Sequence, residues 1–287
     1  MRTWPVIEVA SLTRPELFQA ALVDYKITAV DETSQPGAWR VFFGTADDRD
    51  AAAGALAKQF PDLVIRAIDV PDEDWVARSQ ATLKAVQVGG IIVAPPWDVP
   101  HTGRLKPLSS AEAGVTGLRR PLVIVIRPSM GFGTGHHATT KLCLGALQQI
   151  PVHGRNVMDI GTGSGVLAIA ASRLGASRVV AIDEDPNAIH AAQENLGLNR
   201  GAEVTLRAGD VRKDARGPFD VVLANLTGAL LREVPERLID LAAPGAHFIL
   251  SGFMRSEEAD VLASYAGVPV TSRTEEQEWL CVTLQRP

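Results

Sequence analysis

The stretch Asn156-Val-Met-Asp-Ile-Gly-Thr-Gly-Ser-Gly-Val-Leu-Ala-Ile-Ala170 joins two apolar runs through three glycines. The run at 157–160 predicts a buried strand, and the periodic run at 166–174 predicts a helix. Gly161, Gly163 and Gly165 form the turn between them. Strand, glycine turn and helix in this order place a helix N-terminus at the carboxyl end of a parallel sheet. Open α/β sheets bind their cofactors at that place.

Composition limits the functions open to the chain. It has 287 residues, 46% of them hydrophobic and 21% charged, and its formal net charge is −5. This length accommodates one large or two ordinary globular domains. The negative charge provides no basic field for nucleic acid or for an anionic membrane. We therefore expect no direct nucleic-acid or membrane partner. Because no extended apolar surface demands a dimer, we also expect a monomer.

Cysteine content and the first residues bear on the cellular compartment. Cys143 and Cys281 are the only cysteines, so no disulfide framework is expected, as in proteins of the reducing cytoplasm. Glu8 interrupts the apolar residues near the start, so we expect no signal peptide. No window approaches the roughly 20 apolar residues of a membrane-spanning helix. Together these features predict a cytoplasmic protein.

Residues 1–70 carry the pattern of a small α+β domain. Predicted strands cover residues 5–9, 27–31, 39–43 and 63–70, and predicted helices cover 15–25 and 47–60, the second beginning at Asp47 or Asp48. The order β-α-β-β-α-β is that of the split βαβ, ferredoxin-like sandwich. Because this region contains no catalytic constellation, we expect it to bind a partner or to pack against the rest of the chain.

Residues 71–120 predict a linker. Acidic residues at 72–74 suit a helix N-terminus, and this helix should run from residue 71 to about residue 83, with Gly89-Gly90 as its stop. A short strand at 91–94 follows. Residues 98–120 contain proline, glycine, serine and scattered charges without periodicity, and they predict a loop.

Residues 121–287 alternate between strands and helices, which predicts a doubly wound, mostly parallel sheet. Besides the central strand, strands are expected at 122–127, 178–183, 203–207, 219–224 and 247–250, and an antiparallel pair at 268–271 and 279–284 should form the sheet edge. Helices are expected at 141–149, 186–196, 229–241 and 256–265. Asp185 as cap and Pro186 at the first helical position mark the start of the second of these helices.

A second glycine-rich loop, Met130-Gly-Phe-Gly-Thr-Gly-His-His-Ala-Thr-Thr140, precedes the helix at 141–149. Its glycines allow close approach of the backbone to a ligand. The hydroxyls of Thr134, Thr139 and Thr140 could cap the helix or donate to a ligand carboxylate. Phe132 could cover a bound ligand. The alternative is a mobile surface turn followed by a capped helix.

Acidic residues at strand ends favour S-adenosylmethionine over a dinucleotide. Asp159 precedes a GxGxG turn, which differs from the GxGxxG of dinucleotide sites. Asp183 ends the next strand and could bind ribose hydroxyls in either class of enzyme. Asp210 follows the third strand, where it could accept a hydrogen bond from an adenine amino group. The alternative for Asp183 or Asp210 alone is a loop acid or a helix cap.

The chain resembles the class I S-adenosylmethionine-dependent methyltransferases, and more narrowly the ribosomal protein L11 methyltransferases (PrmA type). The resemblance is carried by the segments 131–140, 158–168, Ile182-Asp-Glu-Asp-Pro186, Leu223-Ala-Asn-Leu226, Ser251-Gly252 and Glu278-Trp279. It implies a Rossmann-like methyltransferase domain at 121–287, a linker helix and loop at 71–120, and a ferredoxin-like substrate-recognition domain at 1–70. Cofactor contacts are then expected from Phe132, Thr134, Gly135, Thr139, Asp159, Gly161, Gly163, Gly165, Asp183, Asp210 and Asn225.

The resemblance also implies methyl transfer to amines, namely lysine side chains and the N-terminal α-amine of ribosomal protein L11. The nucleophile must be a neutral amine, and burial beside a positive sulfonium lowers the pKa of an ammonium group without a dedicated base. We expect Asn225 to orient the amine through its amide oxygen and the adjacent backbone carbonyl. The alternative for Asn225 is a helix N-cap.

His136 and His137 are adjacent, and no cluster of cysteines or acids supplies further ligands, so we expect no metal site. A hydrogen-bonding or lid role suits His137 better, with proton transfer as a further hypothesis. Two rival functions remain open. One is a methyltransferase of the same fold that acts on another protein or on a small-molecule amine; the other is a cofactor-sensing binding module without turnover. A nicotinamide oxidoreductase is a more distant rival.

Overall fold

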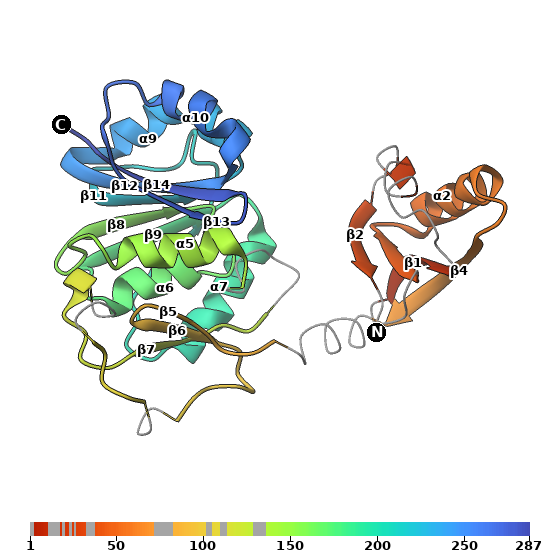
Figure 1. Ribbon diagram of the computed structural model, residues 1–287, viewed down its shortest axis with the longest axis horizontal. Coiled ribbons are helices and arrows are strands. Elements are labelled where there is room, and N and C mark those ends of the chain that lie inside the picture. The colour runs from red at the N-terminus through yellow and green to blue at the C-terminus, as the bar shows by residue number, and fades with distance from the viewer. Residues whose placement is uncertain are drawn as a thin grey trace. The chain divides into compact units, whose positions relative to one another are not determined.

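The computed structural model describes residues 3–10, 18, 21–22, 25, 27–32, 38–71, 83–101, 105–109, 114–128 and 136–287. Contacts divide the chain between Thr82 and Leu83 into two compact units, each shown in Figure 1. The division lies inside the segment 71–120, for which the sequence predicts a linker. Among the described residues, no helix is both long enough and apolar enough to cross a membrane.

The N-terminal unit contains a four-stranded antiparallel sheet and helix α2 (Ala46–Gln59). The strand order is β2-β3-β1-β4, for β1 (Thr3–Ala10), β2 (Ile27–Glu32), β3 (Trp39–Phe43) and β4 (Val64–Pro71). This order confirms the predicted split βαβ arrangement. The expected start of α2 was wrong by one or two residues: Thr45 is the N-cap, and its hydroxyl accepts from the backbone N–H of Asp48.

The core of this unit lies between α2 and one face of the sheet. Ala52 and Leu56 of α2 are buried against alternate sheet residues such as Val41 and Phe43. Of the helix predicted at 15–25, only Phe18, Ala21 and Leu22 are described as helical, and Phe18 and Leu22 are buried in the same core. The helical residues Phe18 and Leu22 and helix α2 share one core with the sheet, which explains how so short a region has a core of its own.

The C-terminal unit is built on a seven-stranded sheet with the order β10-β9-β8-β11-β12-β14-β13. Its strands are β8 (Asn156–Ile160), β9 (Arg178–Asp183), β10 (Thr205–Ala208), β11 (Phe219–Asn225), β12 (Ala242–Met254), β13 (Val270–Glu276) and β14 (Trp279–Gln285). The five strands from β10 to β12 run parallel, whereas β14 is antiparallel to both β12 and β13. The predicted doubly wound sheet with an antiparallel edge is therefore confirmed.

Helices cover both faces of this sheet, as Figure 1 shows. One face packs against α5 (Ala138–Leu147), α6 (Val166–Arg173) and α7 (Pro186–Leu198), and the other against α8 (Gly228–Glu233), α9 (Pro235–Leu241) and α10 (Glu258–Ser264). Alternation along the strands separates two cores: Val221 and Leu223 belong to the first, and Val222 and Ala224 to the second. Such alternation within one strand is the mark of a sheet that is buried on both faces.

The single helix predicted at 229–241 is two helices in the structure. Pro235 has no N–H, so it cannot donate to the carbonyl of Leu231, and α8 ends at Glu233. The hydroxyl of Tyr265 donates to that carbonyl at 3.0 Å instead. Because the buried side chain of Tyr265 satisfies this buried carbonyl, the break in the helix is tolerated.

The strand predicted at 122–127 lies outside the main sheet. β7 (Leu122–Val125) pairs parallel with β6 (Ile91–Ala94), and β6 pairs antiparallel with β5 (Val86–Val88). The prediction of Gly89-Gly90 as a helix stop was wrong, because these glycines turn the β5–β6 hairpin. Gln148, the C-cap of α5, accepts from the N–H of Gly90 at 2.7 Å and donates to the carbonyl of Val88 at 2.9 Å. These bonds attach the small sheet to α5.

Strand β12 is longer than the sequence predicts. It begins at Ala242, although Pro244 and Gly245 predict a turn there. The N–H of Gly245 donates to the carbonyl of Arg286, just beyond the end of β14, so the segment keeps a pairing partner. Between β6 and β7 the described residues 98–101, 105–109 and 114–121 contain only a 3-10 turn at Gly114–Thr116, in keeping with the predicted loop.

Candidate active site

The glycine turn between β8 and α6 has the conformation that its sequence predicts. Gly161, Gly163 and Gly165 have φ values of 67°, 52° and 82°, in the left-handed region that favours glycine. A Cβ atom on Gly161 would lie 2.4 Å from Cδ2 of Leu226, the residue after β11. The backbone of the turn therefore closely approaches the end of the neighbouring strand.

Asp159 supports this turn from within. Its Oδ2 accepts from the hydroxyl of Thr162 at 2.6 Å and from the N–H of Ala168, in the first turn of α6, at 3.1 Å. The side chain is 1% exposed, and burial raises its pKa to about 6 against the lowering effect of these hydrogen bonds. The N-terminus of α6 thus interacts with a carboxylate of the chain itself. A dinucleotide would have to place its pyrophosphate there, which disfavours that class of cofactor.

Asp183, which ends β9, and Asp210, which follows β10, both line one cavity of about 220 Å³. Asp183 is fixed by the N–H of Gly163, which donates to Oδ2 at 2.9 Å, and by the N–H of Asp185, which donates to Oδ1 at 3.0 Å. Each oxygen keeps a lone pair for a further donor. The cavity lies at the carboxyl ends of the strands and is lined by Ile160, Gly161, Ile182, Asp183, Glu184, Gly209, Asp210, Val211, Arg212, Leu226 and Leu230.

Of the predicted cofactor residues, the structure brings Gly161, Asp183 and Asp210 to this cavity. It places Asp159 beneath the turn rather than on the cavity wall. Phe132, Thr134 and Gly135 lie outside the described residues. Sequence reasoning missed Arg212, whose guanidinium bonds both carboxylate oxygens of Asp210. These bonds, with the backbone N–H of Arg212 and the positive charges of Arg212 and Lys213, hold the pKa of Asp210 below its usual range.

Asn225 is the last residue of β11, between β8 and β12. Its amide Oδ1 is buried and has no hydrogen-bond partner among the described residues. The alternative of a helix N-cap is wrong, because Thr227 caps α8 and accepts from the N–H of Leu230. A Cβ atom on Gly252 would lie 2.2 Å from the carbonyl oxygen of Leu226, so only glycine allows the β12 backbone this close.

His137 is the N-cap of α5, a role that the sequence suggests for Thr134, Thr139 or Thr140. The N–H of Thr139 donates to Nδ1 of His137 at 3.3 Å, and the hydroxyl of Thr139 lies 2.8 Å from the same atom. Burial lowers the pKa of His137, with a further lowering by Lys141 and an opposing effect of Glu276. A neutral ring that accepts at Nδ1 carries its proton on Nε2, which leaves no free acceptor.

Trp279, at the start of β14, packs edge-on against the ring of His137, with 4.8 Å between the ring centroids. Trp279 therefore packs against the residue that caps α5. The other histidine of the pair, His136, has its Nε2 2.8 Å from the carbonyl oxygen of Lys84. The two adjacent histidines thus make contacts with different partners. The hydroxyl of Thr140, also in α5, is buried without a hydrogen-bond partner among the described residues.

Comparison with known proteins identifies the family. Residues 24–287 match the model of the family described as ribosomal protein L11 methyltransferase (PrmA). The chain belongs to this family. Among its relatives, the ribosomal protein L11 methyltransferase of Myxococcus xanthus (strain DK1622) is 36% identical over 253 residues, which are 86% of this chain and 82% of that protein. The corresponding protein of Geobacter sp. (strain M21) is 37% identical over 225 residues, 76% of this chain and 69% of that one.

A solved structure supports the fold. The ribosomal protein L11 methylase from Lactobacillus delbrueckii subsp. bulgaricus aligns with a TM-score of 0.61 at 24% identity, over 71% of this chain and 98% of that one. As a PrmA-family member, the chain is a methyltransferase that uses S-adenosylmethionine. The cavity fits that cofactor, because bare backbone at Gly161 and acceptors on Asp183 and Asp210 suit a nucleoside with hydroxyl and amino donors.

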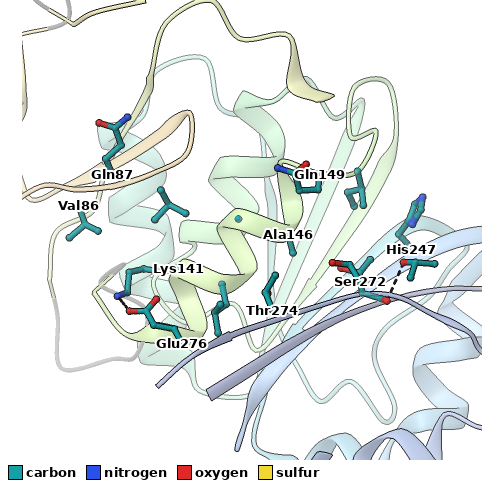
Figure 2. A pocket seen from close by; sticks show the side chains of 15 residues that line it. Val86, Gln87, Lys141, Ala146, Gln149, His247, Ser272, Thr274 and Glu276 are labelled. Atoms are coloured by element: carbon teal, nitrogen blue, oxygen red, sulfur yellow. Dashed lines mark hydrogen bonds and ion pairs between the residues drawn. The ribbon is translucent and has the colours of Figure 1, made fainter. Parts of the chain in front are cut away.

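A larger cavity of about 940 Å³ lies beside α5, also in the C-terminal unit. Figure 2 shows Lys141 and Glu276 paired at one end and His247 at the other, with Ser272 and Thr274 of β13 along one wall. None of the predicted cofactor residues that the structure describes lines it. The cavity at the strand ends has the smaller volume, but the glycine turn and both acids meet there.

Proposed function

We propose that the chain transfers methyl groups from S-adenosylmethionine to amines of ribosomal protein L11. Lysine side chains are the principal acceptors, with the N-terminal α-amine as a further acceptor. Family membership supports the reaction, and relatives at 36% and 37% identity, which are ribosomal protein L11 methyltransferases, suggest the substrate. In this proposal the N-terminal ferredoxin-like region recognises L11, and residues 71–120 link it to the catalytic domain.

The observation that carries the proposed chemistry is the amide oxygen of Asn225, which has no hydrogen-bond partner in the part of the chain that the structure describes. A buried acceptor without a donor costs free energy, so its presence at the carboxyl end of β11 points to a donor supplied by a ligand. A substrate amine has N–H donors, and the glycine turn lies beside this strand end. We assign to Asn225 the role of accepting a hydrogen bond from the amine and aligning its lone pair.

The proposed mechanism needs positioning and exclusion of water more than a dedicated base. Bound S-adenosylmethionine supplies an electrophilic methyl group on a positive sulfonium. Asn225 orients the amine for in-line attack, and burial of the site favours the neutral amine over ammonium. His137 acts in this scheme as the cap that orders the start of α5, because its Nδ1 already accepts from Thr139. Proton transfer by His137 would require that cap to open.

Apart from Asn225, the predicted cofactor residues fall into three groups. Gly161, Asp183 and Asp210 contact the nucleoside within the cavity, as their shared lining supports. Asp159 and Thr139 act by ordering the two loops, through their hydrogen bonds to Thr162 and His137. Gly163 and Gly165 shape the glycine turn by their positive φ values, and the N–H of Gly163 also holds Asp183. Phe132, Thr134 and Gly135 remain proposed contacts of the loop that precedes α5.

Incubation with isotopically labelled S-adenosylmethionine and purified ribosomal protein L11, followed by intact-mass measurement, tests the substrate. We expect L11 to gain mass in steps of one methyl group, and peptide mapping should place the label on lysine side chains. Total ribosomal protein without L11 is the control. Tight binding of adenosylhomocysteine without label on L11 would contradict the substrate and leave the methyltransferase assignment intact.

Size-exclusion chromatography and cell fractionation would test the expected monomer and its cytoplasmic location.

A further inference from the structure

Arg212 joins three acidic side chains at the rim of the cofactor cavity. Its Nε donates to Oδ1 and Oδ2 of Asp210 at 2.8 and 2.9 Å. One terminal nitrogen donates to Oε1 of Glu233 in α8 at 2.9 Å, and the other lies 3.7 Å from Oε2 of Glu184, just after β9. The three acids come from three separate segments, and a single guanidinium contacts all of them.

These contacts hold Asp210 in one orientation. The backbone N–H of Arg212 also donates to Oδ1 of Asp210, at 2.9 Å. Oδ1 therefore accepts two of the three bonds from Arg212, and Oδ2 accepts one. Because a carboxylate oxygen has two lone pairs, Oδ2 retains the capacity for another donor. The backbone is fixed as well, since the N–H of Asp210 donates to Oδ2 of Asp214 at 2.9 Å.

We propose that Arg212 is a positioning residue that makes the cavity selective for a purine with an amino group at position 6. The inference rests on the proposed contact between Asp210 and the cofactor. Oδ2 of Asp210 accepts from a 6-amino group, whereas a 6-oxo group would direct its own lone pairs at the carboxylate. A site that contains an oriented acceptor rejects a ligand without the matching donor.

The geometry of the guanidinium, rather than its charge alone, is what this role requires. The planar fork of arginine binds a carboxylate through fixed directions, while a lysine ammonium is a point charge on a flexible stem. Lys213 provides a natural contrast in the same loop. Its Nζ lies 3.9 Å from Oδ2 of Asp210, and its side chain is 78% exposed, so it contributes charge without a hydrogen bond.

Isothermal titration of the full chain with S-adenosylhomocysteine and with S-inosylhomocysteine tests the proposal. We expect the unaltered protein to prefer the amino form by about tenfold or more, as for a hydrogen bond to a charged acceptor. Arg212→Ala and Arg212→Lys should both reduce this preference to within about threefold. Lys213→Ala is the matched control and should leave the preference unchanged.

Three outcomes separate this inference from its alternatives. Equal weakening of both ligands in Arg212→Ala, with the preference kept, would show a merely structural role and overturn the proposal. Retention of the full preference in Arg212→Lys would assign the effect to charge and overturn it too. If Arg212→Ala does not fold, the preference of Arg212→Lys for S-adenosylhomocysteine over S-inosylhomocysteine decides whether the proposal holds. Failure of the unaltered protein to bind S-adenosylhomocysteine would instead contradict the cofactor site itself.

Discussion

Asn225 carries the proposed chemistry at the residue scale, because its buried amide oxygen accepts from no described group. Replacing it by alanine removes the acceptor that aligns the amine, but leaves Gly161, Asp183 and Asp210 in place. We expect Asn225→Ala to lower turnover by roughly 10- to 100-fold. Its affinity for adenosylhomocysteine, measured by titration calorimetry, should remain within about threefold of the parent value. Equal losses of turnover and affinity would contradict the orienting role.

The conservative change Asn225→Asp distinguishes an acceptor from a simple packing residue. Aspartate restores an acceptor oxygen, but its negative charge favours the ammonium form of the substrate and raises the amine pKa. We therefore expect turnover to recover relative to Asn225→Ala, with the pH–rate profile moved to higher pH.

Asp159 makes stability depend on pH. Burial raises its pKa from 3.8 to about 6 in the folded chain, so between these values the folded state binds more protons than the unfolded state. Its contribution to stability is therefore complete below about pH 4 and is lost as pH rises through about 6. Against Asp159→Asn, which does not titrate, the parent protein should gain up to about 3 kcal/mol in unfolding free energy between pH 7 and pH 4.

Urea unfolding at intervals from pH 4 to pH 7 measures this difference, because the other carboxyl groups titrate in both proteins and cancel. A difference between parent and variant that does not change with pH would show that Asp159 has an ordinary pKa, despite its burial beneath the glycine turn.

At the scale of elements, the start of α5 depends on a histidine cap. His137→Ala removes the acceptor for the N–H of Thr139 and should lower the unfolding free energy by about 1 kcal/mol. His137→Asn keeps an effective cap, so we expect near-parental stability and turnover. Thermal unfolding and the methylation assay measure the two properties separately. Loss of turnover in a stable His137→Asn variant would favour proton transfer by the imidazole instead.

At the scale of the whole molecule, the two compact units have separate hydrophobic cores. The cofactor cavity and Asn225 lie entirely after Leu83. We therefore expect a shortened chain that begins at Leu83 to bind adenosylhomocysteine as the full chain does, but to lose methylation of ribosomal protein L11. Calorimetry and the labelling assay measure these two properties. Full methylation of L11 by the shortened chain would contradict substrate recognition by residues 1–70.

Local sequence patterns determined much of the fold. The glycine turn was predictable because its three positive φ values suit glycine, and the flanking apolar runs have strand and helix periods. The order of strands and helices predicted the doubly wound sheet, since parallel strands require crossover helices. The meeting of Gly161, Asp183 and Asp210 followed as well, because the carboxyl ends of neighbouring parallel strands lie at one sheet edge.

Only the tertiary structure decided what surrounds these residues. Three features join residues that are distant in sequence. They are the pairing of β7 with β6, the hydrogen bond from Tyr265 to the carbonyl of Leu231 at the helix break, and the contacts of Arg212 with Glu184 and Glu233. That the oxygen of Asn225 has no partner among the described residues is likewise a property of the residues packed around it. Periodicity and turn chemistry act over a few residues. Pairing and burial depend on which segments meet in space, and no short stretch of sequence contains that information.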